Sequence, residues 1–299
     1  MTTWSASRPS RSSSTWSRSA SRRPEAAMSD EFHVKLYRKF QTFFQEAEKK
    51  RRWNPVEDIP WNELNPDAPE SLALCAETFL GVESYLPDYI RGGLEAVRAS
   101  SVAQRWFTAN WGYEELKHSM ALTEYLVRSG KRTEEQMFDF QAQLMEEEWE
   151  RPFETGRQMT VYGMFQEMAT FVIYLRHEKL ALEHSDKALA TVYRLNARDE
   201  CAHARFYEDV TRVYLEEDRE GTIADLAFVA KRFRMPGVGL VPDYDQRIEV
   251  MRDEGKMDRD IFLKKVYFPL LKRLDVGRRE LVAAAAAERR AARETEAAE

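Results

Sequence analysis

The sequence lacks any long apolar run and contains little cysteine, glycine or proline. Within its 299 residues no stretch approaches the ~18–20 consecutive apolar residues of a membrane span, so we expect a soluble protein. The two cysteines, Cys75 and Cys201, cannot build a disulfide framework, which predicts a reducing, cytoplasmic setting. The net charge of −6 at pH 7 argues against nucleic acid as the main partner.

The two ends of the chain differ in composition from the rest. Residues 1–27 are rich in Ser and Arg and contain no acid before Glu25, a composition that cannot build a core. They are typical of an over-extended start, with translation beginning at Met28, or of a transit peptide, which would imply a plastid. Residues 281–299 are rich in Ala, Arg and Glu and predict a helix or a frayed tail. The folded domain is therefore expected to span residues 28–280.

Between these ends the pattern is helical. Glycine and proline are sparse, at 12 and 11, and apolar residues recur at steps of three and four, as in FQEMATFVIYLRH. Breaks are expected at 51–71, 128–133 and 234–245, where Pro, Gly and Asn cluster. The sequence predicts an all-α domain of long helices.

Two short stretches, EELKH and DECAH, each place an acid three residues before a histidine in a chain with only five histidines. On a helix, residues i and i+3 share a face, so Glu115 points with His118 and Glu200 with His203. Acids make up about one residue in six here, so this spacing alone is a weak signal.

The context of the two pairs is more specific. Glu83 lies 32 residues before Glu115, Glu167 lies 33 before Glu200, and both upstream glutamates sit in otherwise apolar helices. Burying such carboxylates unpaired would cost several kcal/mol each, so a positive group must compensate them unless they are solvated or salt-bridged. One acid from each of two helices and Glu-x-x-His from the other two is the arrangement of ferritin-like di-iron bundles.

The donor set also indicates the metal. Four carboxylates neutralise two divalent irons, and oxygen ligands with imidazole suit iron or manganese rather than a structural zinc. The sequence therefore predicts a four-helix core with additional helices, whose metal ligands are Glu83, Glu115, His118, Glu167, Glu200 and His203.

Longer stretches resemble the soluble acyl-carrier-protein desaturases, the stearoyl-ACP desaturase family (fatty acid desaturase type 2). The resemblance runs from about residue 40 to 275, in the family's order. It is carried by KKRRWNPVEDIP (49–60), VESYLPDY (82–89), WGYEELKH (111–118), FQEMATF (165–171), DECAH (199–203) and RMPG (234–237). It implies a homodimeric di-iron enzyme that uses dioxygen and electrons from ferredoxin to desaturate a fatty acyl chain on acyl carrier protein.

The resemblance also implies residue roles. Glu83 and Glu167 would be terminal carboxylates, Glu115 and Glu200 would bridge the irons, and His118 and His203 would each cap one iron. Asp199 would orient a metal histidine and, with Trp53, carry electrons, while Thr170 would help to activate dioxygen. The alternatives are core packing or a loop anchor for Trp53, and a bond to its own helix for Thr170.

The implied chemistry needs a substrate tunnel. An unactivated methylene C–H bond is too strong for acid–base catalysis, so the oxidant must come from metal and dioxygen. An apolar tunnel would position the chosen carbons. Its predicted walls are Trp111, Met159, Tyr162, Met164 and Phe171.

The carrier is less clearly indicated. Two positions that are basic in the plant enzymes are Cys201 and Ala202 here, whereas basic runs remain at 49–52 and 231–234. These runs suit an acidic partner. Fatty-acid ACP, a polyketide-type carrier and acyl-CoA all remain open.

Three other functions account less well for the sequence. A ribonucleotide reductase small subunit needs a radical tyrosine where this chain has Leu122, with Tyr125 further on. An arylamine N-oxygenase needs an additional histidine, and His177 and His184 lie in polar sequence where we expect them to be solvated. An iron-storage bundle needs only about 150–170 residues, so the helices past residue 205 favour an enzyme.

Overall fold

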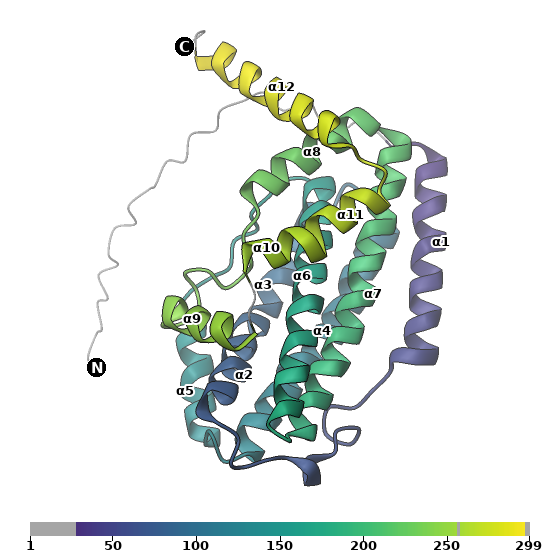
Figure 1. The fold of residues 1–299 in the computed structure, drawn as a ribbon. Coiled ribbons are helices and arrows are strands. Elements are labelled where there is room, and N and C mark those ends of the chain that lie inside the picture. Colours follow the sequence, from purple (N-terminus) through teal and green to yellow (C-terminus); the bar gives the residue numbers. More distant parts are fainter. Residues whose placement is uncertain (1–27, 256–257, 297–299) are drawn as a thin grey trace, which may run out of the picture.

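The computed structural model describes residues 28–255 and 258–296, and its secondary structure over these residues is helical (Figure 1). The segment 1–27 lies outside the described residues. The helices are α1 (Asp30–Glu46), α2 (Glu70–Glu83), α3 (Leu86–Ala96), α4 (Val102–Arg128), α5 (Glu134–Leu144), α6 (Gly156–Glu183), α7 (Lys187–Glu217), α8 (Arg219–Arg232), α9 (Tyr244–Gly255), α10 (Arg259–Phe262), α11 (Phe268–Arg273) and α12 (Arg278–Glu296), with short turns η1 (Ala47–Arg51), η2 (Trp61–Glu63) and η3 (Leu263–Tyr267).

The long helices begin where the sequence supplies side-chain caps. Ser101 accepts a hydrogen bond from the Ala103 amide at the start of α4, and Thr155 caps α6 in the same way. Asp186 caps α7, directly after Ser185 takes a left-handed conformation (φ 58°) and reverses the chain. These caps satisfy amides that have no partner within the helix.

The centre of the molecule is a four-helix bundle. The α6 and α7 helices form the most extensive pair, α2 packs on α4, and α4 packs on α7. Figure 1 shows α1 outside this bundle, beside α7 at its edge. The predicted all-α, ferritin-like fold with additional helices is confirmed.

The connections match the predicted breaks. Loop segments lie around η2, between α4 and α5, and between α8 and α9. In the last of these, Gly237 and Gly239 have φ of 92° and 77°, a conformation that favours glycine. This loop crosses α2, because a Cβ on Gly237 would lie 2.8 Å from Cγ2 of Val82.

The C-terminal residues described belong to α12, which packs on α8. Leu281 is buried, and Arg232 of α8 pairs with Glu288 at 2.6 Å. Among the residues described, no helix is long and apolar enough to cross a membrane.

Candidate active site

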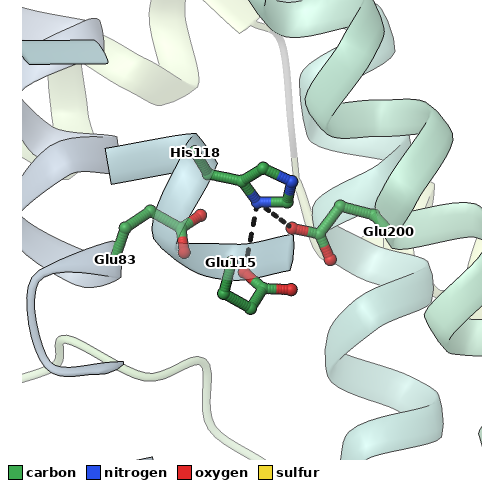
Figure 2. Close-up of side chains that lie close together, drawn as sticks. All are labelled: Glu83, Glu115, His118 and Glu200. Carbon is green, nitrogen blue, oxygen red and sulfur yellow. Dashed lines mark ion pairs between the residues drawn. The ribbon is translucent and has the colours of Figure 1, made fainter. Parts of the chain in front are cut away.

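The structure brings the six predicted ligands together in the middle of the bundle. Glu83 is the last residue of α2, Glu115 and His118 come from α4, Glu167 from α6, and Glu200 and His203 from α7. All six are buried, with at most 8% of each residue exposed. Figure 2 shows four of them, Glu83, Glu115, His118 and Glu200, converging from three helices.

The six residues form two overlapping groups, within each of which the donor atoms lie no more than 4.8 Å apart. One group contains Glu83 and His118, and the other contains Glu167 and His203. Glu115 and Glu200 belong to both groups. This is the geometry of two neighbouring cation positions that share two carboxylates.

Each histidine turns Nδ1 toward this cluster. Nδ1 of His118 lies 3.1 Å from Oε2 of Glu115 and 3.6 Å from Oε1 of Glu200 (Figure 2). Nδ1 of His203 lies 2.9 Å from Oε1 of Glu115 and 3.3 Å from Oε2 of Glu167. A metal ion at either position would therefore meet an imidazole nitrogen together with carboxylate oxygens.

The other ring nitrogen of each histidine faces an acid on the opposite helix. Nε2 of His118 lies 3.7 Å from Oδ2 of Asp199, and Nε2 of His203 lies 2.8 Å from Oε2 of Glu114. Each acid directly precedes the shared glutamate of its own helix. Glu114 was not predicted as a site residue, although its place in EELKH matches that of Asp199 in DECAH.

Cations and a tryptophan surround these two outer acids. Nε1 of Trp53 donates a hydrogen bond of 2.7 Å to Oδ2 of Asp199, and Nζ of Lys117 lies 3.4 Å from the same oxygen. The guanidinium groups of Arg51 and Arg52 lie 3.5 and 3.8 Å from Oε1 of Glu114. The nearby positive charges thus pair with the outer acids.

The protonation of the cluster fits a site built for cations. Burial, followed by the charge of Glu115, raises the pKa of Glu83 to about 8, and burial with Glu115 and Glu167 raises the pKa of Glu200 well above its usual range. Burial lowers the pKa of His118, but Glu115 and Asp199 outweigh it and raise the value to about 10. Without metal the cluster holds protons, which two divalent cations would displace.

Two further side chains orient the remaining carboxylates. Nε1 of Trp111 donates to Oε1 of Glu167 at 3.1 Å, and the hydroxyl of Tyr174 donates to Oε1 of Glu83 at 2.7 Å. Sequence reasoning missed Tyr174, because a tyrosine on an apolar helix face is usually core. Such contacts fix the orientation of the two carboxylates.

An apolar cavity opens onto the cluster, with Glu83, Glu115 and Glu167 in its wall. Trp111, Met159 and Tyr162 line it, as predicted from the sequence. The prediction was wrong for two residues: Met164 is packed in the core, and Phe171 lines a groove on the other side of α6. Walls that the sequence analysis did not single out come from α2, the α8–α9 loop and α9, including Phe79, Val82, Met235, Pro236, Tyr244, Ile248 and Met251.

Thr170 also lines the cavity, one turn after Glu167. Its hydroxyl donates to the carbonyl of Gln166 at 3.0 Å, which is the alternative noted from the sequence. The side chain therefore combines a bond to its own helix with a position beside the cluster.

The expectation that His177 is solvated was wrong. Only 1% of this residue is exposed, and its Nδ1 lies 2.9 Å from the carbonyl of Ile173. Its ring packs against Phe79 and Tyr193. Burial lowers its pKa to about 4. The polar flanking sequence did not indicate that His177 is buried, because only its packing against the neighbouring helices shows that it faces inward.

Comparisons with known proteins agree with this site and fold. DesA1 of Mycobacterium tuberculosis, assigned as an acyl-[acyl-carrier-protein] desaturase, is 24% identical over 251 residues, which cover 76% of this chain and 72% of the relative. The chloroplastic stearoyl-[acyl-carrier-protein] 9-desaturase of Olea europaea is 31% identical over 162 residues, 52% of this chain and 42% of the relative.

A solved structure and a family model extend the comparison. The X-ray structure of DesA2 from M. tuberculosis H37Rv, assigned as an acyl-ACP desaturase, has the same fold at a TM-score of 0.59 and 18% identity, covering 83% of this chain and 100% of that one. The model of the fatty acid desaturase family matches residues 72–294, which are 223 of the 299 residues. The chain therefore belongs to the fatty acid desaturase family and is an oxidoreductase of the acyl-ACP desaturase type.

Proposed function

We propose that this protein is a dioxygen-dependent di-iron desaturase that introduces a double bond into a carrier-bound fatty acyl chain during fatty acid biosynthesis. The observation that carries the proposal is the apolar cavity whose wall contains three carboxylates of the buried cluster. An iron-storage protein needs no such cavity beside its metals. Acyl carrier protein is the proposed carrier, because the relatives are assigned to acyl-ACP.

The six clustered residues would hold two irons, with Glu115 and Glu200 shared between them. When bound, the irons would supply the dioxygen chemistry that breaks unactivated C–H bonds. The protein's part is to fix the ligands: Asp199 and Glu114 hold the histidine rings, while Trp111 and Tyr174 hold Glu167 and Glu83. In this proposal Thr170 lies at the oxygen-binding side, and Trp53 with Asp199 leads electrons toward His118.

The cavity would bind and align the acyl chain. Its apolar walls exclude water and hold two adjacent methylenes beside the cluster, so their shape sets the position of the double bond. The reaction RCH₂CH₂R + O₂ + 2e⁻ + 2H⁺ → RCH=CHR + 2H₂O balances only with two electrons from outside. Ferredoxin or a similar one-electron protein is therefore the proposed donor.

We also propose that the enzyme is a homodimer joined through α4. An apolar stripe on this helix is exposed: Val102, Trp106, Ala109, Tyr113, Leu116 and Met120. Their spacing of 4, 3, 4, 3 and 4 is that of a heptad seam, which packs against another helix of the same period. The same stripe on a second copy supplies that helix.

The proposed function is tested by turnover. Protein beginning at Met28 would be loaded with ferrous iron and given reduced ferredoxin, dioxygen and stearoyl-ACP, with mass spectrometry of the released acid and dioxygen uptake as readouts. A new monounsaturated acid is the expected result. Dioxygen uptake without a modified acyl chain would contradict the proposed substrate.

The metal assignment is tested separately. Glu200→Ala and His203→Ala should each lose most of the bound iron, whereas Glu183→Ala, at the exposed end of α6, should retain it. Full iron content and activity in either cluster variant would show that the assignment is wrong.

A further inference from the structure

We propose that a column of buried polar side chains in the bundle core binds ordered water and carries protons to the candidate metal cluster. This polar column runs along the inward face of α7 with Asp186, Tyr193 and Asn196, and it includes Tyr125 of α4 and Tyr174 of α6. At most 1% of each of these residues is exposed. The assigned role rests on the proposed function, because the proposed reaction takes up two protons from outside the molecule.

The polar column continues the inward faces of the helices that bear the predicted ligands. On three of them a buried tyrosine lies seven residues from a ligand: Tyr125 from His118, Tyr174 from Glu167 and Tyr193 from Glu200. Seven residues are two turns, which return a side chain to nearly the same face about 10 Å further along the axis. On α2 the corresponding residue, seven before Glu83, is the buried Ala76, which fills little of this layer. A layer of three tyrosines therefore lies next to the ligands.

The polar column and the acyl cavity extend from the cluster toward opposite ends of the bundle. On α4 the cavity residues Thr108 and Trp111 precede the cluster, whereas Tyr125 follows it. On the antiparallel α7 the order is reversed, because the column residues precede the cluster and the cavity residue Tyr207 follows it. An acyl chain in the cavity therefore leaves the column free to conduct protons.

The polar atoms of the column indicate what it binds. Five of them have no hydrogen-bond partner among the residues described: the hydroxyls of Tyr125 and Tyr193, both amide atoms of Asn196, and Oδ2 of Asp186. A buried tyrosine hydroxyl usually has a partner, and buried polar atoms in native proteins bond to other protein groups or to ordered water. A buried water needs two to four polar neighbours, which this column supplies. Ordered water is therefore the occupant that satisfies these atoms.

The two ends of the column reach the cluster and the end of the bundle. At the inner end the hydroxyl of Tyr174 donates a hydrogen bond of 2.7 Å to Oε1 of Glu83, and the amide of Asn196 lies beside this hydroxyl. At the outer end Asp186 caps α7 and directly follows the exposed Ser185. The column therefore leads from a surface turn to a predicted metal ligand.

The groups between these ends are neighbours. Tyr125 and Asp186 lie beside each other, and the ring centroids of Tyr174 and Tyr193 are 5.8 Å apart. A proton passes along hydroxyls and waters when each group accepts a proton from one side and donates its own to the other. The net transfer is one proton from solvent to the carboxylate of Glu83, after which every column group has regained its starting protonation. No electron moves through the column.

The test removes polar atoms from the column and leaves the ligands in place. The variants are Tyr193→Phe and Asn196→Leu. Their matched control, Tyr214→Phe, removes a buried hydroxyl near the other end of α7, where it bonds to Gln104 at 3.3 Å. The direct readout is exchange of the Tyr174 hydroxyl proton with solvent in the metal-free, full-length protein.

This exchange is measured by NMR of tyrosine isotope-labelled at Cζ, in equal parts of H₂O and D₂O. Fast exchange gives one averaged Cζ line for Tyr174 and slow exchange gives two, with the line assigned through Tyr174→Phe. Dioxygen consumption with reduced ferredoxin and stearoyl-ACP is the second readout. Iron content and melting temperature check that each variant is folded.

Wild type and Tyr214→Phe should each show one averaged line for Tyr174, and crystals of the wild type should show water bonded to Tyr193 and Asn196. Tyr193→Phe and Asn196→Leu should each show two lines, because the chain of waters is interrupted. Both should consume dioxygen about 100-fold more slowly than wild type, with normal iron content, because proton transfer then limits the reaction.

Two lines for Tyr174 in wild type, or a dry column in its crystals, would overturn the proposal. One averaged line in both column variants would also overturn it, since protons would then reach Tyr174 by another route. So would slower exchange with unchanged dioxygen consumption. The exchange measurement needs no turnover, so column-dependent exchange and dioxygen consumption without a new double bond would refute only the proposed substrate.

Discussion

At the scale of single residues, each of the two histidines faces an acid on the opposite helix. Asp199 on α7 faces His118 on α4, and Glu114 on α4 faces His203 on α7. An acid on the outer ring nitrogen fixes the ring's orientation and leaves Nδ1 free of its proton to bind metal. The crossing also ties α4 to α7, so the ligand geometry depends on how these two helices pack.

Glu114→Gln tests the less expected half of this pair. Removing the charge should weaken binding of ferrous iron about 10- to 100-fold, because the ring of His203 loses its anionic partner and Arg51 is left unpaired. Iron affinity would be measured by anaerobic titration. Glu124→Gln, a half-exposed acid on the same helix, is the control and should bind iron normally. Normal affinity in Glu114→Gln would remove this residue from the site.

His177 gives a prediction for stability against pH. Its pKa in the folded protein is about 4, below its ordinary value of 6.5, so between these values the unfolded chain binds a proton that the folded chain does not. The contribution of His177 to the free energy of unfolding is complete above about pH 6.5 and is lost as the pH falls to 4. At 1.36 kcal/mol per pKa unit the loss is about 3 kcal/mol.

The variant His177→Asn isolates this contribution, because its amide can still donate to the carbonyl of Ile173. Urea unfolding of both proteins at pH 7, 5.5 and 4 should show a smaller decline in the free energy of unfolding for the variant. Parallel declines in the two proteins would mean that His177 titrates normally in the folded state.

At the scale of elements, helical periodicity predicted the helices and put the six predicted ligands on inward faces, because the face of a residue follows from its spacing along one helix. It did not predict which neighbouring helix each helix face packs against. Phe171 was expected in the tunnel, but it lies about 100° further around α6 than Thr170 and faces the groove. His177 was misjudged for the same reason. Contacts between helices, such as Glu114 with His203, depend on packing that no single segment encodes.

The α8–α9 loop offers a test of how the cavity wall is built. Gly239→Ala meets no atom within 4 Å, so it should cost only the roughly 1 kcal/mol of a left-handed backbone. Gly237→Ala adds a contact of 2.8 Å with Val82, a cavity residue, and should cost about 1–3 kcal/mol more. Urea unfolding measures both. Only Gly237→Ala should also change kcat/KM for stearoyl-ACP. An equal loss of unfolding free energy in the two variants would show that the contact between Gly237 and Val82 does not shape the cavity wall.

At the scale of the whole molecule, the α4 stripe of the proposed dimer lies beside the cations that surround the candidate metal site. Tyr113, at the centre of the stripe, lies under the guanidinium of Arg52 at 5.1 Å and near the ammonium of Lys117 at 5.6 Å. These two cations pair with the outer acids Glu114 and Asp199. A second copy packed on α4 would therefore remove water from this layer and strengthen its charge interactions.

The surface available is large enough for such a dimer. At 1.5 Å per residue, α4 is about 40 Å long. The exposed side chain of Tyr37 on α1 lies beside its N-terminal half and contacts Trp106. A strip of this length that is about 20 Å wide provides the ~800 Å² per partner of a standard interface. A contiguous exposed apolar patch of several hundred Å² marks an interaction site.

Ala109→Arg/Met120→Arg should therefore convert a dimer into a monomer, because two buried, unpaired cations would face the same seam of the partner. Sedimentation velocity at micromolar concentration measures the change. Ala142→Arg/Met145→Arg, at exposed positions of α5 and its C-terminal end, is the matched control and should remain dimeric. The monomeric variant should retain its helicity but bind iron more weakly, since the layer around Tyr113 is open to water. A wild-type protein that sediments as a monomer, or a stripe variant that stays dimeric, would place the interface elsewhere.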